Sequence, residues 1–220
     1  MEKRQYHTEM DDIIKMLPSD PPPKLLLHSC CGPCSTAVLE CLTPHFEILL
    51  LYYNPCIAPA DEFARRVETQ RQLLDAMTPV HPITLLVPPY VPEEYLRAVG
   101  DAMDTPEGGE RCRRCIAQRM EEAARAAAAY GCEWFTTTLS VSPHKNASYI
   151  NQCGERLAGE YAVRFLPSDF KKRGGYARSV ELSRSYGLYR QDYCGCLRSL
   201  AEAEARRLQR GAGDNGNTHK

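Results

Sequence analysis

The chain has 220 residues, a formal net charge of −1, 43% hydrophobic and 25% charged residues, the composition of an ordinary globular domain. The first 20 residues alternate charged and apolar side chains, and no stretch approaches the roughly 20 apolar residues of a membrane span, so we expect neither a signal peptide nor a transmembrane segment. Eleven cysteines are unusual, and we predict a reducing, cytoplasmic location, where clustered cysteines more often bind metal or catalyse than form bridges.

Helices and strands are predicted to alternate along the chain. We expect a helix and Pro-rich lead-in at 1–23, a single α/β domain at 24–210 that holds the functional site, and a disordered tail at 211–220. Apolar runs rich in β-branched and aromatic residues predict strands at 24–28, 46–53, 82–87, 133–138 and 162–165. Amphipathic or helix-forming stretches predict helices at 2–17, 35–42, 61–77, 93–99, 115–130, 148–158, 176–186 and 197–209.

This alternation predicts a Rossmann-like parallel sheet with helices on both faces. In such a fold, the loops after the first, second, fourth and fifth strands meet at one edge of the sheet. Those loops hold Cys30–Cys34, Asn54–Cys56, Thr136–His144 and Asp169–Arg173. We therefore expect a single functional site at this edge.

Seven cysteines fall into three tight groups: Cys30, Cys31 and Cys34; Cys112 and Cys115; Cys194 and Cys196. Two cysteines separated by two residues before a helix can bind one metal, so we expect metal ligation at the second group. A disulfide across a single residue is strained and easily reduced, so the third group suits a redox couple or metal ligands. Spacing leaves zinc and iron–sulfur both open, and redox chemistry beside the site favours iron–sulfur. The four isolated cysteines are expected to be small buried hydrophobic residues.

Basic residues are concentrated in one segment near the C-terminus. From Arg164 to Arg198, eight Lys and Arg residues stand against three Asp and Glu residues, with four tyrosines among them. Such a pattern suits contact with phosphates and unstacked bases, although a solvated helix face with core tyrosines would have the same residue pattern. The candidate RNA-binding residues are Lys171, Lys172, Arg173, Tyr189 and Arg190.

Together these motifs resemble the cobalamin-independent epoxyqueuosine reductases of the QueH family. The resemblance runs from about Lys24 to Arg198. It rests on the stretches Leu-Leu-His-Ser-Cys-Cys-Gly-Pro-Cys, Tyr53-Asn-Pro, Arg111-Cys-Arg-Arg-Cys, Thr136-Thr-Thr-Leu-Ser-Val-Ser-Pro, Asp169-Phe-Lys-Lys-Arg-Gly-Gly and Gly187-Leu-Tyr-Arg-Gln-Asp-Tyr-Cys-Gly-Cys. It implies reduction of epoxyqueuosine to queuosine at the wobble position of tRNA, with an electron donor that the sequence does not identify.

The resemblance also implies a [4Fe-4S] cluster at the carboxyl edge of the strands, and it leaves open a second, mononuclear iron. Its expected cluster ligands are Cys30, Cys31, Cys112 and Cys115, and its expected redox pair is Cys194 and Cys196. Neighbouring side chains of an extended strand point in opposite directions, so Cys30 and Cys31 reach one cluster only if the chain turns between them. Otherwise one of them serves the second iron with the redox pair.

Two departures from the family pattern are visible. Where the family usually reads Asn-Pro-Asn-Ile-His-Pro, this chain has Asn54-Pro-Cys-Ile-Ala-Pro59. Some relatives place an acidic metal ligand at position 34, where this chain has Cys34.

Removing an epoxide oxygen as water requires two electrons and two protons, and Asp169 and His144 are the candidate proton donors.

Two other functions fit parts of the pattern. An iron–sulfur tRNA sulfurtransferase shares the fold class and the cysteine pairs, but it normally needs ATP, and no glycine-rich phosphate loop follows the first strand. A zinc-stabilised RNA-binding protein without catalytic activity is the other possibility. Bound metal separates them, since zinc is colourless and redox-inert.

Overall fold

A five-stranded parallel sheet forms the centre of the protein, whose computed structural model describes residues 4–214. The strands are β1 (Lys24–His28), β2 (Glu47–Leu51), β3 (Ile83–Leu86), β4 (Trp134–Thr137) and β5 (Arg164–Phe165). Their order across the sheet is β3-β2-β1-β4-β5, and every neighbouring pair is parallel. The predicted α/β fold with an all-parallel sheet is confirmed.

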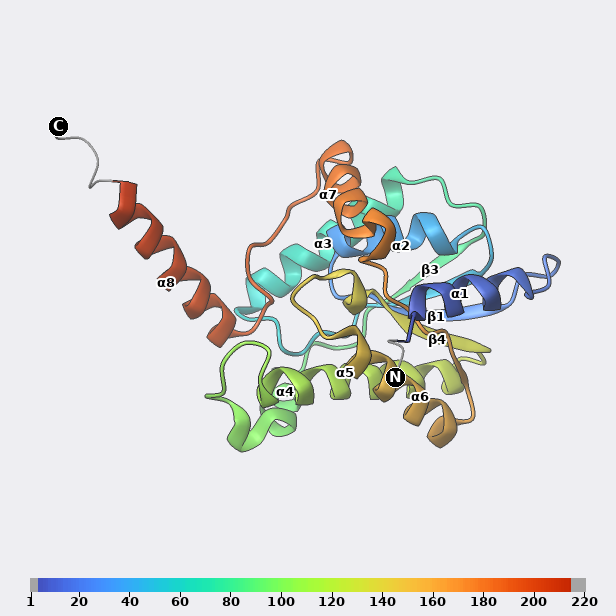
Figure 1. The fold of residues 1–220 in the computed structure, drawn as a ribbon, viewed down its shortest axis with the longest axis horizontal. Coiled ribbons are helices and arrows are strands. Elements are labelled where there is room, and N and C mark those ends of the chain that lie inside the picture. Colours follow the sequence, from blue (N-terminus) through green and yellow to red (C-terminus); the bar gives the residue numbers. More distant parts are fainter. Residues whose placement is uncertain (1–3, 215–220) are drawn as a thin grey trace.

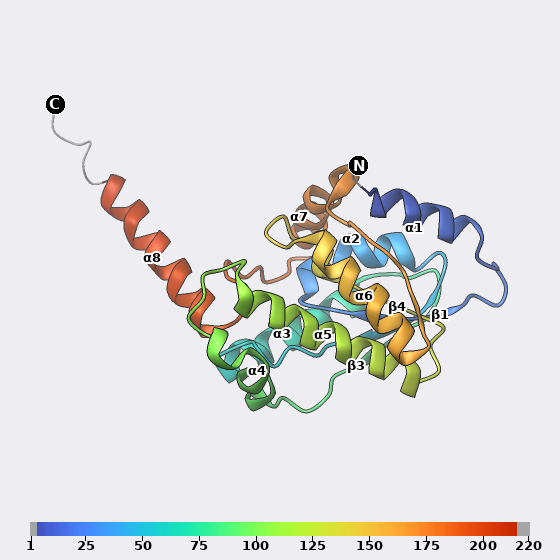
Figure 2. The ribbon, with the colours of Figure 1, turned by 60° about the horizontal axis from the view of Figure 1, so that its bottom comes forward.

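Eight α-helices lie within the described range (Figure 1). They are α1 (Tyr6–Lys15), α2 (Gly32–Leu42), α3 (Ala60–Ala76), α4 (Pro92–Val99), α5 (Glu110–Ala129), α6 (Ala147–Tyr161), α7 (Gly175–Ser185) and α8 (Leu197–Asp214). The last helix extends away from the rest of the chain in both views (Figures 1 and 2). It covers part of the predicted tail, whose remaining residues, 215–220, lie outside the described residues. No helix in the described range has the length and apolar character of a membrane span.

Helices cover both faces of the sheet because β1 is apolar on both sides. Leu26 packs in a core cluster with residues of α5 and α6, which lie side by side in Figure 2. Leu25 and Leu27 point the other way, into a cluster formed with α1, α2 and α3. Alternate side chains of a strand face opposite sides, so a continuous leucine run is the pattern of a doubly covered strand.

Local sequence explains where the two cysteine-bearing helices begin. Cys31 is the N-cap of α2, where its sulfur accepts a hydrogen bond from the Cys34 amide, and Pro33 occupies the first turn. The helix therefore starts at Gly32, three residues earlier than predicted, and includes Cys34. Helix α5 begins at Glu110, so Cys112 and Cys115 both lie in its first two turns.

The strand order marks the end of β1 as the expected place for a ligand. From β1 the chain proceeds to β2 on one side, whereas β4 pairs with β1 on the other side, so the order reverses at this strand. Ligands of open α/β sheets bind at such a reversal, beyond the carboxyl ends of the strands. Cys30 lies just after β1, and Thr138 lies just after β4. The Thr138 hydroxyl accepts a hydrogen bond from the Cys30 amide at 3.0 Å.

Candidate active site

The first three cysteines form one compact group at the end of β1, which we name the strand-end thiols (Cys30, Cys31 and Cys34). Their sulfur atoms all lie within 4.8 Å of one another. The chain bends at Cys30 before Cys31 returns to extended backbone, and this bend brings neighbouring side chains together. The turn that the sequence required between Cys30 and Cys31 is therefore present.

Hydrogen bonds prepare one sulfur of this group to ionise. The Thr138 hydroxyl donates to the Cys30 sulfur at 3.3 Å. Hydrogen bonds from the Cys31 and Cys34 thiols lower the pKa of Cys30, whereas burial raises the pKa of Cys31 to about 12. Cys30 is therefore the thiol of this group that ionises most readily, and the thiolate is the form that binds metals.

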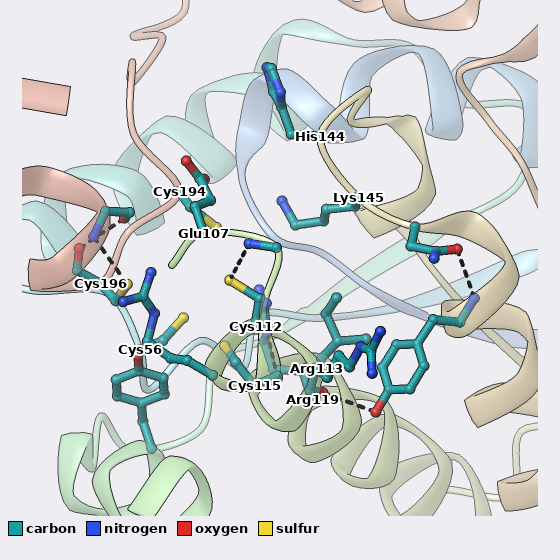
Figure 3. A pocket seen from close by; sticks show the side chains of 17 residues that line it. Cys56, Glu107, Cys112, Arg113, Cys115, Arg119, His144, Lys145, Cys194 and Cys196 are labelled. Atoms are coloured by element: carbon teal, nitrogen blue, oxygen red, sulfur yellow. Dashed lines mark hydrogen bonds between the residues drawn. The ribbon is translucent and has the colours of Figure 1, made fainter. Parts of the chain in front are cut away.

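Five further cysteines line a cavity of about 150 Å³ beside this group. We name them the cavity thiols: Cys56, Cys112, Cys115, Cys194 and Cys196. They come from the loop after β2, from the start of α5 and from the segment before α8. Figure 3 shows their sulfur atoms turned toward the same space. All eleven cysteines of the chain are free thiols, so a Cys194–Cys196 disulfide is not present.

Cys56 is buried in a core cluster, as expected of an isolated cysteine, and it also lines the cavity. It is 4% exposed, and a hydrogen bond with the Cys115 thiol, aided by Arg119, lowers its pKa. The available signal was its position, since Asn54–Cys56 follows β2 at the edge where the site was expected. Whether an isolated cysteine at this edge faces the other thiols depends on the direction of its side chain. The spacing of cysteines in the sequence does not predict that direction.

The turn that carries Cys194 and Cys196 is held by neighbours on α3 and the loop before it. Gly195 has a φ of 141°, a conformation that side chains rarely adopt. Its carbonyl accepts a hydrogen bond from the Ala58 amide at 2.9 Å. The buried guanidinium of Arg66, paired with Glu62 at 2.6 Å, donates to the Cys194 carbonyl at 3.1 Å. These contacts fix the backbone of the turn that carries both cysteines.

Two cations stand among the sulfur atoms. Arg119 is 3% exposed, and its Nε donates to the Cys115 carbonyl at 3.1 Å. Burial opposes the charge of Lys145, but the sulfurs of Cys194 and Cys30 outweigh it and raise the lysine pKa. Neither cation has a carboxylate partner among residues 4–209, for which side chains are described. Cys30 and Cys56, whose pKa values are lowered, are the nearby thiols best able to balance these charges, and Arg119 feels sulfur atoms of both thiol groups.

The two predicted proton donors occupy different places. His144 lines the cavity and is exposed, whereas Asp169 is not among the lining residues and pairs with Lys171 at 2.8 Å. His28, next to the strand-end thiols, is fully buried and structural. Its Nε2 donates to the Tyr53 carbonyl at 3.0 Å, and its Nδ1 accepts from the Thr137 hydroxyl at 2.9 Å. Burial lowers the pKa of His28 to about 4, so its ring is neutral.

Most cations of the 164–198 segment are paired with acids. Arg173 pairs with Asp11, and Arg178 pairs with Glu40 at 2.6 Å. Arg164 and Arg198 also have acidic partners, and Arg190 donates to the Ser183 hydroxyl at 2.8 Å. Tyr189 is engaged as well, with its hydroxyl 3.1 Å from Glu62. The local charge excess read from the sequence is thus largely neutralised by residues from other elements.

Comparisons with known proteins agree with the motif pattern. A family model described as "Epoxyqueuosine reductase QueH" matches residues 25–202. A protein of that name from Streptococcus pyogenes serotype M1 is 42% identical over 177 residues, covering 80% of this chain and 69% of the relative. Another from Thermotoga maritima is 36% identical over 81% of this chain and 91% of the relative. A third, from Acinetobacter baylyi, is 34% identical over 90% of each chain.

Proposed function

The chain belongs to the epoxyqueuosine reductase QueH family, and on this premise we propose that the cavity is where epoxyqueuosine in tRNA is reduced, beside an iron–sulfur cluster held by the two thiol groups. The chain is an oxidoreductase that converts epoxyqueuosine to queuosine, the final step of queuosine biosynthesis. The observation that carries the proposal is the gathering of thiols around Arg119 and Lys145, two cations without carboxylate partners in the described part of the chain.

The residues present fit an anionic iron–sulfur cluster. Its ligands would be Cys30, Cys31, Cys112 and Cys115, and Arg119 and Lys145 would balance its charge. A bound cluster supplies electrons one at a time, and iron is a Lewis acid toward an epoxide oxygen. Cys34, whose sulfur lies among the strand-end thiols, would serve a second iron if one binds. In that case Cys30 or Cys31 and the Cys194–Cys196 pair are the other ligand candidates.

The Cys194–Cys196 pair matches the electron count of the reaction. Conversion of two thiols to a disulfide releases two electrons and two protons. Conversion of the epoxide to an alkene breaks two C–O bonds, forms the π bond between the two carbons and releases the oxygen as water. This conversion consumes two electrons and two protons. A separate electron donor must then reduce the disulfide. The strain of a bridge across one residue favours its reduction.

The proton donors and the RNA contacts come from the residues predicted for them. Of the two predicted proton donors, His144 is supported by its place at the cavity, and Asp169 would need to reach it from its ion pair with Lys171. For tRNA, the exposed Lys172 has no acidic partner among the described side chains and is the best supported residue of the predicted set.

Anaerobic purification with iron and sulfide analysis, followed by conversion of epoxyqueuosine-containing tRNA, tests this function. We expect brown protein with iron and sulfide, and we expect C196S to keep the iron but lose turnover. The matched control is C41S, because Cys41 is exposed and does not line the cavity. Stoichiometric zinc without iron in the wild-type protein would contradict the cluster. Loss of iron in C196S would make the pair metal ligands instead of a redox couple.

A further inference from the structure

Two neighbouring arginines at the start of α5 have opposite surroundings. Arg114 lies 2.7 Å from Asp101 and 3.2 Å from Glu110, so its charge is neutralised. Arg113 is exposed, lines the cavity and has no carboxylate partner among the side chains described in residues 4–209. The same helix turn therefore carries one neutralised arginine and one whose charge is available at the cavity.

Arg113 is held beside an aromatic ring. Its guanidinium lies 6.0 Å from the centre of the Tyr149 ring, and the Tyr149 hydroxyl donates to the Arg113 carbonyl at 3.3 Å. Tyr149 itself is fixed in the first turn of α6, where its amide donates to the Asn146 N-cap at 3.1 Å. Helices α5 and α6 thus present a cation and a partly exposed aromatic ring together. Both side chains are already held in place, so binding a ligand does not have to order them.

The charge of Arg113 is not needed inside the cavity. Arg119 and Lys145 line the cavity with the sulfur atoms and already supply positive charge there. Glu107 is the one carboxylate among the lining residues, and it lies 3.7 Å from Arg206. Among the described cations that line this cavity, Arg113 is therefore the one without neighbouring cysteine sulfurs or a carboxylate to balance its charge.

We propose that Arg113 and Tyr149 form a subsite for the single-stranded RNA next to the modified nucleoside, with a base stacked on Tyr149 and a phosphate bound by Arg113. A loop nucleotide offers an unstacked base and a phosphate together, and aromatic rings and guanidinium groups recognise these two parts. The subsite rests on the proposed function, because the modified nucleoside must enter this cavity to bring its neighbours to the mouth. It differs from the 171–173 region, which lies before α7.

The test measures binding of an anticodon stem-loop RNA carrying epoxyqueuosine to the iron-containing protein, across a salt series, for R113Q, R114Q, Y149A and Y149F. R113Q should bind about tenfold more weakly, and its slope against salt should fall by roughly 0.7, the value for one phosphate of a single strand. Y149A should lose about tenfold with little change in slope, and Y149F should stay within about twofold of wild type because its ring still stacks. R114Q, the matched control, should also stay within about twofold, because its charge is already neutralised.

Wild-type affinity and slope in R113Q would overturn the subsite, as would an equal loss in R114Q, which would indicate a general charge effect. A fall in iron content in R113Q would also overturn it, because the arginine would then support the metal. If R113Q binds RNA normally but turns over slowly with a protein electron donor, Arg113 serves that donor and the proposal is wrong. Wild-type protein that binds the RNA through this subsite but cannot reduce it would leave the subsite standing and contradict the proposed function.

Discussion

The strand-end thiols and the cavity thiols are two solutions to the same task of gathering sulfur atoms. Cys30, Cys31 and Cys34 come from one turn, where a bend and a helix N-cap bring their sulfurs within 4.8 Å. The cavity thiols come from three distant segments, and they meet only because the loop after β2, the start of α5 and the segment before α8 pack together. The first group depends on local backbone geometry, and the second depends on tertiary packing.

Substitution of one member of each group gives the largest expected effect. If both groups hold one cluster, C30S and C115S should each remove nearly all iron and visible colour, because a missing ligand opens the cluster. Iron and sulfide analysis after anaerobic purification measures this. The control is C132S, since Cys132 is buried in the core and does not line the cavity. A C115S protein that keeps its iron on the strand-end thiols would show that the two groups bind metal independently.

Gly195 tests whether tertiary packing aims the cavity thiols. A Cβ at this position would lie 2.9 Å from Ile57 Cγ1 and 3.3 Å from Arg66 Nη1, in addition to the strain of a φ of 141°. We expect G195A to lose about a hundredfold in turnover through misplacement of Cys194 and Cys196, with iron retained. We also expect a loss of about 1–3 kcal/mol in the free energy of unfolding.

Gly159 provides the control for this substitution. It lies within α6, and no atom would approach its Cβ within 4 Å. G159A should therefore keep full turnover and gain up to about 1 kcal/mol of stability from its higher helix propensity. Normal turnover in G195A would show that the cysteine pair does not depend on this turn.

His28 tests the local support of the strand-end thiols. Its pKa is about 4 in the folded protein, against the ordinary value of 6.5, so folding keeps the ring neutral. The unfolded chain binds the proton more readily, so this stability is present above about pH 6.5 and is lost as pH falls toward 4. Between about pH 7 and pH 5 the loss should be about 2 kcal/mol.

Urea unfolding of the iron-free protein at these two pH values measures the effect, and H28Q should reduce the difference by that amount. Iron-free protein is used because a nearby metal would add its own charge. An equal pH dependence in H28Q and wild type would assign the effect to other groups.

The smallest effect is expected at Lys171, Lys172 and Arg173, on the side of the molecule where α7 packs on α2, which carries Cys34. Lys171 and Arg173 already pair with acids, so replacing all three residues with glutamine should weaken RNA binding only about threefold. The salt slope should fall by roughly 0.7, the contribution of Lys172 alone. Iron content should not change. If the triple variant binds RNA with wild-type affinity and salt slope, the RNA contacts the protein only on the cavity side.

Element order was predictable because strands and helices have different hydrophobic periods. The leucines of β1 predicted its observed bounds, and the Ala-rich run predicted the end of α5 to within one residue, although α5 begins at Glu110, five residues before its predicted start. Helix α2 was predicted to start too late, because a cysteine N-cap is not among the common capping residues. Asp169 stays a predicted proton donor, and its carboxylate pairs with Lys171 outside the cavity lining.

By itself the sequence determined the parallel α/β fold, the edge where the site lies and the family to which the motifs belong. These follow from periodicity, from the geometry of parallel strands and from short spacings, all of which are local. Only the tertiary structure decided that Cys56 faces the other thiols, that Arg119 and Lys145 stand among them, and that acids from other elements neutralise most of the basic segment. The physical reason is that side-chain direction and charge pairing depend on which elements pack together, and that information is not contained in any single stretch of the chain.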